Sequence, residues 1–280
     1  MATAKDTPIT NTSMMRFVGK VAVVTAGASG IGAAAAQRLH AEGASVVVGD
    51  INSEGIDRLA KEFGDRFLGV RCDVTQEREV HALMGAAIDR FGRIDVACCV
   101  TGGGGHGGIL ETDEVSWRRC FDLTLTSTFF TVKHSARRMI DANRGGSIVT
   151  VSSICAQIPQ GAGYSSAKAG VEMFTKVAAL ELGEHAIRVN AVAPGRTATS
   201  ATEKTDFVVG PAWVNQTPLG RIGSPEEIAA AMAFLASDEA GFISGANLTV
   251  DGAFSTSTFS HIYPKLAHRP ALAHQIGQPF

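Results

Sequence analysis

The stretch VAVVTAGASGIG, residues 21–32, decides the fold of this chain. Its first part, Val21–Thr25, is a continuous apolar and β-branched run, which predicts a buried strand. Gly27, Gly30 and Gly32 follow, and a run of small residues after them predicts a helix. Glycine lets the backbone turn tightly at such a junction, and free N–H groups in the first turn of a helix bind phosphate groups. The stretch therefore predicts a strand–turn–helix unit that cradles a dinucleotide, in preference to a merely tight turn.

Apolar runs of the same kind recur along the chain and alternate with helical patterns. Continuous runs are typical of parallel strands buried on both faces, and their alternation with helices is typical of βαβ units. The predicted strands are Val21–Thr25, Ser45–Gly49, Phe67–Arg71, Ile94–Val100, Ser147–Val151, Ile187–Val192 and Asn247–Val250. The predicted helices are Gly32–Glu42, Gln76–Phe91, Trp117–Asp141, Tyr164–Leu182 and Pro225–Ala236, the last with a capping box from Ser224 and Glu227. The sequence therefore predicts an α/β chain with one doubly wound, seven-stranded parallel sheet.

The composition excludes several classes of protein. Hydrophobic residues make up 45% of the 280 residues and charged residues 19%, which provides a large core and excludes a disordered or coiled-coil chain. The 25 basic and 27 acidic residues leave a net charge of −2, so we expect no nucleic acid and no membrane surface as a partner. No run approaches the ~18 apolar residues of a membrane span. The expected partner is a small molecule.

The cysteines and histidines predict no metal site. The five cysteines show no C-x-x-C spacing, so neither a disulfide framework nor a zinc site is indicated. The C-terminal histidines His261, His268 and His274 fit no zinc motif either. Free thiols fit a reducing compartment, and we expect a cytoplasmic protein.

Asp50 indicates which dinucleotide the cradle takes. It follows the second apolar run, eighteen residues after Gly32, where a carboxylate accepts both ribose hydroxyls of an adenosine and repels a 2′-phosphate. No Arg or Lys stands in the glycine-rich turn or at the two positions after Asp50, so the sequence favours NAD over NADP. Asp73 follows the third run in the same way. It either reaches the adenine amine or caps the helix that begins near Gln76.

Tyr164, Lys168 and Ser153 form a predicted proton-transfer site. Tyr164 and Lys168 are four residues apart in a helical pattern, so their side chains share one face. A tyrosine has a pKa near 10, and lowering it to neutral pH requires about 4 kcal/mol. An ammonium ~4 Å away supplies about that much. Ser153, at the end of a predicted strand, hydrogen bonds the same substrate oxygen.

The order of these motifs resembles the short-chain dehydrogenase/reductase family. The glycine-rich turn, Asp50, Ser153, the Tyr164–Lys168 pair and the stretch Asn190 to Thr199 occur in one order over about residues 20–252. The resemblance implies a single-domain Rossmann fold and a nicotinamide cofactor, with Tyr164 as acid/base, Lys168 holding the nicotinamide ribose and Ser153 positioning the carbonyl or alcohol. It also implies a homotetramer with subunit contacts at Trp117–Asp141 and Tyr164–Leu182. The expected cofactor-binding residues are Gly27, Ser29, Gly30, Ile31, Gly32, Asp50, Ile51, Asp73, Val74, Cys99, Tyr164, Lys168, Pro194, Gly195, Thr197 and Thr199.

The chain departs from the family pattern at several places. Ala26 stands where the family has the first glycine of the turn, and the segment 99–102 reads Cys-Val-Thr-Gly where the family has Asn-Asn-Ala-Gly. Thr124 stands at the position of an asparagine that holds a water behind the lysine. If that role falls to the backbone carbonyl, threonine can substitute; if the amide is essential, turnover is slow. The interval before Tyr164 is short, which leaves Ser152 and Ser153 as alternatives for the catalytic serine.

The expected function is an NAD-dependent dehydrogenase that interconverts a secondary alcohol and a ketone. We expect a disordered arm over residues 1–16, a catalytic domain over 17–253 and a tail over 254–280 that packs on a neighbouring subunit. The segment 197–217 is expected to cover the substrate, and its apolar residues Phe207, Val208, Val209, Pro211 and Trp213 favour an alicyclic or aromatic compound. His106 is a weaker candidate for substrate contact. The alternatives are a catalytically silent NAD(H)-binding sensor or partner subunit, and an NADPH-dependent carbonyl reductase.

Overall fold

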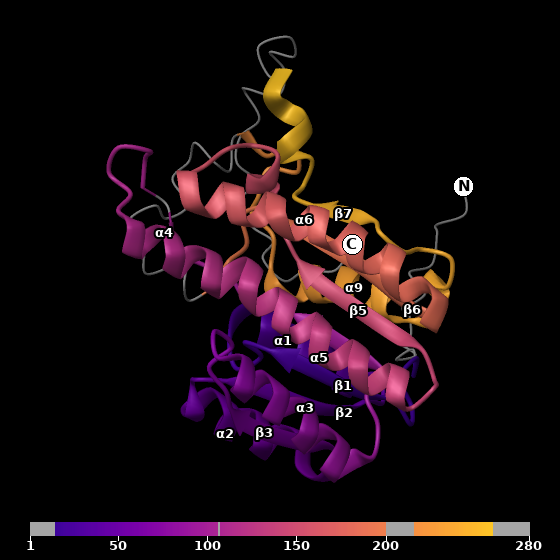
Figure 1. Cartoon of the computed structure of the whole chain (residues 1–280). Coiled ribbons are helices and arrows are strands. Elements are labelled where there is room, and N and C mark those ends of the chain that lie inside the picture. The colour runs from indigo at the N-terminus through magenta and orange to yellow at the C-terminus, as the bar shows by residue number, and fades with distance from the viewer. Residues whose placement is uncertain (1–14, 106, 200–215, 260–280) are drawn as a thin grey trace, which may run out of the picture.

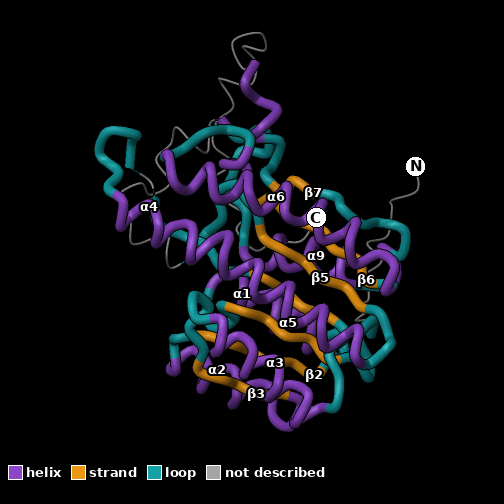
Figure 2. The backbone as a smooth tube through the Cα atoms, viewed as in Figure 1, coloured by secondary structure: helices purple, strands orange, loops and turns teal. Residues whose placement is uncertain are grey.

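The chain forms one parallel sheet with helices on both faces (Figures 1 and 2). The computed structural model describes residues 15–105, 107–199 and 216–259. The seven strands lie in the order β3-β2-β1-β4-β5-β6-β7, and every pair is parallel. They are β1 (Val21–Thr25), β2 (Ser45–Asp50), β3 (Phe67–Arg71), β4 (Val96–Cys99), β5 (Gly146–Val151), β6 (Ile187–Pro194) and β7 (Asn247–Val250). The predicted doubly wound Rossmann fold is confirmed.

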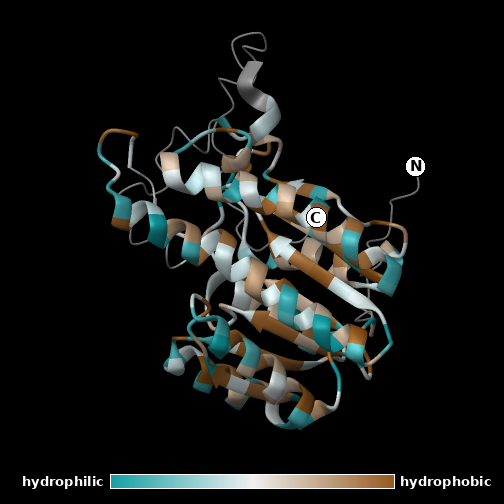
Figure 3. Cartoon of the chain, viewed as in Figure 1, coloured by the Kyte–Doolittle hydropathy of each residue, from teal (hydrophilic) through white to brown (hydrophobic). Residues whose placement is uncertain are grey.

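The helices cover the sheet in two layers, each with its own apolar core. They are α1 (Gly30–Ala41), α2 (Ser53–Phe63), α3 (Glu77–Phe91), α4 (Glu114–Phe121), α5 (Ser127–Asp141), α6 (Ala162–Leu182) and α9 (Pro225–Ala236). One core joins the sheet to α1, α2 and α9, and the other joins it to α3, α5 and α6. Figure 3 shows the hydrophobic strands between these layers. Strands buried on both faces read as continuous apolar runs, which explains why the sequence pattern located them.

The element boundaries differ from the prediction at several places. Helix α2 was not predicted, although Asn52 caps it by accepting from Gly55 N at 3.1 Å. Strand β4 is shorter than the predicted Ile94–Val100, and β6 runs on to Pro194. The predicted helix Trp117–Asp141 begins at Glu114 and is interrupted by a π-helical turn at Asp122–Thr126. The capping box of Ser224 and Glu227 is present at the start of α9.

Both chain ends, His106 and part of the predicted lid lie outside the described residues. These are residues 1–14 of the predicted arm, His106, the apolar lid residues at 207–213 and the tail histidines. Arg16, assigned to the arm from the sequence, belongs to the folded body because its guanidinium donates to Glu42 and Glu239. Of the tail, Phe254–Phe259 forms a 3₁₀ helix. Among the helices of the described ranges, none is long and apolar enough to cross a membrane.

Candidate active site

The glycine-rich turn lies where the strand order reverses, between β1 and β4. Gly30 has a φ of +51°, and a Cβ on Gly32 would lie 2.0 Å from the Ala26 carbonyl oxygen, so neither position accepts a side chain without strain. Ser29 precedes α1 and makes no side-chain cap, which leaves the first-turn N–H groups directed out of the helix. Such a turn accepts a pyrophosphate. The residues present therefore fit a dinucleotide.

The segment after β6 closes the other side of the cradle. A Cβ on Gly30 would meet the Thr199 side chain at 3.3 Å, so the two segments are in close contact. The Thr197 hydroxyl donates to the Gly195 carbonyl oxygen at 3.1 Å, and Gly195 N donates to Val250 O at 2.9 Å. Gly30 follows β1 and Thr199 follows β6, so two predicted cofactor residues lie together although about 170 residues separate them in the chain.

Asp50 lies against the glycine-rich turn. Its carboxylate is buried and accepts from Ala28 N and Asn52 N, both at 2.9 Å. Each carboxylate oxygen can accept a second hydrogen bond, so ribose hydroxyls remain possible partners. Ile51 is 63% exposed beside it. Arg58 was not predicted as a site residue, but its guanidinium donates to Ala28 O at 3.0 Å and brings a cation to the turn from α2.

The remaining predicted adenosine-side residues have different environments. Asp73 does not cap α3, because its Oδ1 accepts from the Thr75 N–H and hydroxyl while the cap position belongs to Gln76. That alternative for Asp73 was wrong. Val74 is 7% exposed. Cys99 is fully buried in the core on the α3 and α5 side, so it can offer a cofactor only its backbone.

Ser153, Tyr164 and Lys168 meet at the carboxyl end of β5. The Tyr164 phenol and the Ser153 hydroxyl share a hydrogen bond. The Lys168 ammonium donates to Val151 O at 2.7 Å and to Thr101 O at 3.2 Å, and it lies 5.7 Å from the centre of the Tyr164 ring. Ser152 points elsewhere, toward the Lys168 carbonyl oxygen. Of the two serines, Ser153 is therefore the one beside Tyr164.

Burial sets the protonation of both groups in the protein alone. It raises the pKa of Tyr164 to about 12, an effect that the hydrogen bond from Ser153 opposes. Burial also lowers the pKa of Lys168 to about 8. The lowered tyrosine pKa expected from the sequence is thus not produced by the lysine alone. The reason is that desolvation of the phenol is the largest influence on its pKa.

Thr124 lies in the π-helical turn between α4 and α5 and is fully buried. Its carbonyl oxygen accepts from the Thr128 hydroxyl at 2.7 Å. Its own hydroxyl is near the Cys120 thiol, but it makes no hydrogen bond of normal geometry within the described residues. π-Helical turns leave backbone groups outside the regular ladder and are frequent at functional sites. A Cβ on Gly102 would lie 2.6 Å from Lys168 Nζ and 3.6 Å from the Thr124 methyl group, so this turn brings Thr124 next to the Lys168 site.

Comparison with known proteins decides the family. The family model described as Enoyl-(Acyl carrier protein) reductase matches residues 25–255. The chain is 44% identical over 245 residues to cis-4-hydroxycyclohexanecarboxylate dehydrogenase of Sinomonas cyclohexanicum, which covers 85% of this chain and 98% of that protein. The chain belongs to the short-chain dehydrogenase/reductase family. It is an oxidoreductase that uses a nicotinamide cofactor, as this family does.

Two further comparisons agree with this assignment. Mitochondrial borneol dehydrogenase of Lavandula x intermedia is 38% identical over 249 residues, 88% of this chain and 94% of that protein. The crystal structure of a short-chain type dehydrogenase/reductase from Mycobacterium marinum superposes with a TM-score of 0.82 and 32% identity, covering 86% of this chain and 98% of that chain.

Several residues of this short-chain dehydrogenase/reductase were not found by sequence reasoning. A Cβ on Gly102 would lie 2.6 Å from Lys168 Nζ, so glycine there makes room for the ammonium. The Cys120 thiol donates to Gly104 O at 3.7 Å and holds the glycine-containing loop at residues 102–105 near α4. The half-buried Cys155 lies close enough to Tyr164 to influence the tyrosine pKa. These contacts join segments far apart in the sequence, and no local pattern marks them.

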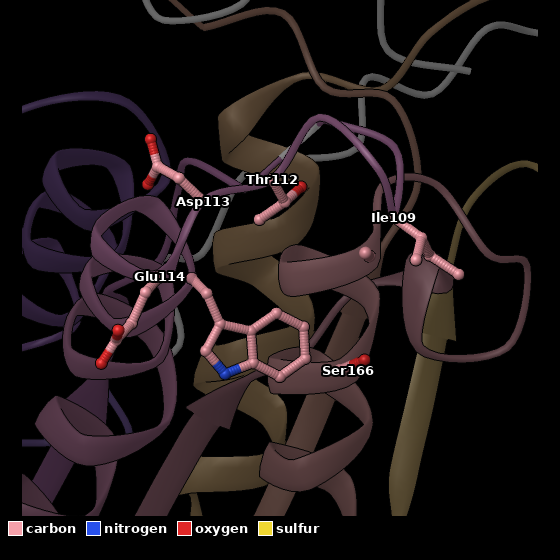
Figure 4. Close-up of a pocket in the computed structure, with 7 residues that line it drawn as sticks. Ile109, Thr112, Asp113, Glu114 and Ser166 are labelled. Carbon is pink, nitrogen blue, oxygen red and sulfur yellow. The ribbon is translucent and has the colours of Figure 1, made fainter.

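A hollow of about 480 Å³ lies beside the site, between α4 and the start of α6 (Figure 4). In Figure 4, Ile109 and Ser166 lie on one side of it and Asp113 and Glu114 on the other. Trp117, Thr112 and Ala162 complete the lining. Neither Ser153 nor Tyr164 lines the hollow, so it neighbours the catalytic groups without containing them.

Proposed function

We propose that this protein is an NAD-dependent dehydrogenase that interconverts an alicyclic secondary alcohol and the corresponding ketone. The observation that carries this proposal is the hydrogen-bonded Ser153–Tyr164 pair above the buried Lys168 ammonium, at the same sheet edge as the glycine-rich cradle. A silent NAD(H)-binding module has no need of these three groups in contact. The proposed catalytic domain is residues 17–253.

The reaction follows from the three side chains. The substrate oxygen accepts from the Ser153 hydroxyl and lies beside Tyr164, whose phenolate takes the alcohol proton in the oxidative direction and whose phenol returns it in the reductive one. A bound nicotinamide supplies the hydride acceptor or donor. The Lys168 ammonium favours the phenolate, and its hydrogen bonds to Val151 O and Thr101 O fix its position. Thr124 belongs to the proton path through its carbonyl oxygen.

The substrate class is proposed from the relatives and the apolar lid composition. The relatives named above act, by their names, on a hydroxycyclohexanecarboxylate and on borneol, which are both ring alcohols. The test is NADH formation from NAD with cis-4-hydroxycyclohexanecarboxylate, borneol, cyclohexanol, a benzylic alcohol and a sugar alcohol. Turnover of the ring alcohols with kcat/KM at least tenfold above the sugar alcohol supports the proposal. A preference for the sugar alcohol contradicts it.

The proposal of NAD over NADP rests on the Asp50 carboxylate. Asp50 stands at the ribose end of the cradle and would repel a 2′-phosphate. Arg58 is the observation that favours the NADPH-dependent alternative, because its guanidinium reaches Ala28 O. Asp50 and Arg58 both contact Ala28, so a carboxylate and a guanidinium lie at the same turn and have opposite effects on a 2′-phosphate. Comparing Kd for NADH and NADPH tests the choice, and we expect NADH to bind at least tenfold more tightly.

We also propose a homotetramer in a reducing compartment, the cytoplasm. Exposed apolar side chains gather on α5 and α6, namely Phe129, Met173, Val177 and Leu180. A second group comprises Phe234 of α9, Leu248 of β7 and Phe242 of the segment between them. Apolar faces of this kind mark subunit contacts. All five cysteines are free thiols, as expected in a reducing compartment. Mass photometry that gives four times the 29.2 kDa chain supports the tetramer, and a monomer contradicts it.

A further inference from the structure

One face of α6 contacts the end of β5 at three successive helical turns. Tyr164, Lys168 and Glu172 are spaced by four residues and share that face. Tyr164 bonds to Ser153, and Lys168 Nζ donates to Val151 O at 2.7 Å. Glu172 continues the series, since its Oε1 accepts from the Ser152 hydroxyl at 3.1 Å. Lys168, Glu172 and Tyr164 thus contact three consecutive residues, 151, 152 and 153 respectively.

Ser152 links the glutamate to the catalytic serine. Its side chain is 2% exposed, and its N–H donates to Val192 O at 2.8 Å. Its single hydroxyl proton has two acceptors, Glu172 Oε1 and the Lys168 carbonyl oxygen at 3.3 Å. A charged acceptor forms the stronger hydrogen bond. The carboxylate therefore fixes the residue that directly precedes Ser153.

Glu172 also reaches the last strand. The same Oε1 accepts from the Asn247 side-chain amide at 2.6 Å. The other Asn247 side-chain atom, Oδ1, is buried and has no hydrogen-bond partner within the described residues, so the carboxylate is the contact that orients this amide. Glu172 thus joins α6, the end of β5 and the start of β7.

We propose that Glu172 is a positioning residue for the dehydrogenase reaction: its carboxylate holds residues 151–153 against α6 so that Ser153 keeps its hydrogen bond to Tyr164. The inference rests on the proposed function, because it assigns Glu172 a role in that same site. Displacement of a reacting group by about 1 Å can lower a rate up to a hundredfold.

The test compares Glu172→Leu, Glu172→Gln and a matched control, Glu181→Leu, at an exposed glutamate of the same helix. We expect Glu172→Leu to lower kcat at least tenfold with Kd for NADH within twofold of wild type. Glu172→Gln keeps an oxygen acceptor and is expected to retain at least one third of kcat, and Glu181→Leu is expected to be unchanged. A kcat for folded Glu172→Leu within twofold of wild type overturns the proposal. So does a parallel loss of kcat and NADH affinity, which indicates a general structural role.

Ser152→Ala provides a second variant that keeps the proposal falsifiable if Glu172→Leu does not fold. It is expected to lower kcat about tenfold, and adding Glu172→Gln is expected to change it by less than twofold further, because both act through one contact. A kcat for Ser152→Ala within twofold of wild type overturns the proposal.

A readout without turnover separates this inference from the proposed function. Tyr164 and Tyr263 are the two tyrosines of the chain, so 3-fluorotyrosine gives two ¹⁹F resonances that Tyr164→Phe assigns. We expect the Tyr164 resonance to shift in Glu172→Leu and to stay in place in Glu181→Leu. An unshifted resonance overturns the positioning role. Absence of alcohol oxidation by wild type contradicts the proposed function alone.

Discussion

The Lys168 ammonium donates to the carbonyl oxygen of Val151 at 2.7 Å, two residues before Ser153. This contact joins Lys168 to the end of β5, which Ser153 follows. Lys168 is only 2% exposed, so its positive charge is buried. A buried ammonium without a carboxylate partner costs folding free energy, which the protein tolerates where the charge is used.

Lys168→Met is expected to abolish activity and to stabilise the protein at pH 7. The folded-state pKa of Lys168 is about 8, below its ordinary value of 10.5. Because the folded pKa is depressed, the destabilisation is fully present below pH 8 and disappears as pH rises toward 10.5. After the loss of the lysine's two hydrogen bonds, we expect a gain of about 2 kcal/mol at pH 7.

Urea unfolding of both proteins at pH 7 and pH 9.5 checks this sign. The difference in unfolding free energy between Lys168→Met and wild type should be at most half as large at pH 9.5 as at pH 7. A variant less stable than wild type at pH 7, or a difference that grows with pH, would show that the ammonium is not destabilising. Lys176→Met, at an exposed position of the same helix, serves as the control and is expected to change neither quantity.

Thr124→Val is expected to preserve activity and raise stability. The Thr124 hydroxyl is buried and makes no hydrogen bond of normal geometry in the described part of the chain, whereas its carbonyl accepts from Thr128. Valine keeps the shape and removes a buried polar atom, so we expect about 1 kcal/mol greater unfolding free energy and kcat within threefold of wild type. A tenfold loss of kcat in Thr124→Val would assign the proton path to the hydroxyl.

Ala26→Gly is expected to stabilise the glycine-rich turn. Ala26 has a φ of +52°, in the left-handed region, which costs a non-glycine residue about 1 to 2 kcal/mol. The glycine variant avoids this conformational cost, but the greater freedom of glycine in the unfolded state lowers stability by about 0.4 to 1 kcal/mol. The net expectation is a gain of about 0.5 to 1 kcal/mol in thermal or urea unfolding.

Two alanines serve as controls for that measurement. Ala186→Gly, at a φ of +56° far from the turn, should also stabilise. Ala169→Gly, on the exposed face of α6, should destabilise by about 1 kcal/mol. If Ala26→Gly behaves like Ala169→Gly, the alanine turn is not strained.

Asp50→Asn is expected to relax the preference between the two nicotinamide dinucleotides. Ala28 N and Asn52 N donate to different carboxylate oxygens, so the amide keeps an acceptor for one of them, and it loses the charge that repels a 2′-phosphate. We expect NADPH affinity to rise at least tenfold. Adding Arg58→Ala should reverse most of that gain, because Arg58 is the cation at the turn. Fluorescence titration with NADH and NADPH measures both, and an unchanged affinity ratio in Asp50→Asn would contradict the role of the carboxylate.

The sheet and much of the site could be predicted because their signals are local. Buried parallel strands such as Val21–Thr25 read as continuous apolar runs, and Asp50 and Ser153 stand directly at strand ends. Tyr164 and Lys168 share a helix face through their spacing alone.

The contacts that could not be predicted depend on tertiary structure. Arg58 reaches Ala28 across thirty residues, and Cys120 reaches Gly104 across sixteen. Ser152 and Ser153 point to different partners, and only the packing of β5 on α6 decides which one meets Tyr164. The π-helical turn at Thr124 leaves no periodicity in the sequence that separates it from an ordinary helix.

Tyr164 is proposed to transfer the proton during oxidation of a ring alcohol. The most direct test is the rate of NADH formation by wild type and Tyr164→Phe at saturating NAD and alicyclic alcohol, with Kd for NADH measured on both. We expect turnover in wild type, a loss of at least a thousandfold in Tyr164→Phe, and a Kd for NADH that differs by no more than about threefold between the two proteins. Turnover by Tyr164→Phe within tenfold of wild type would contradict it.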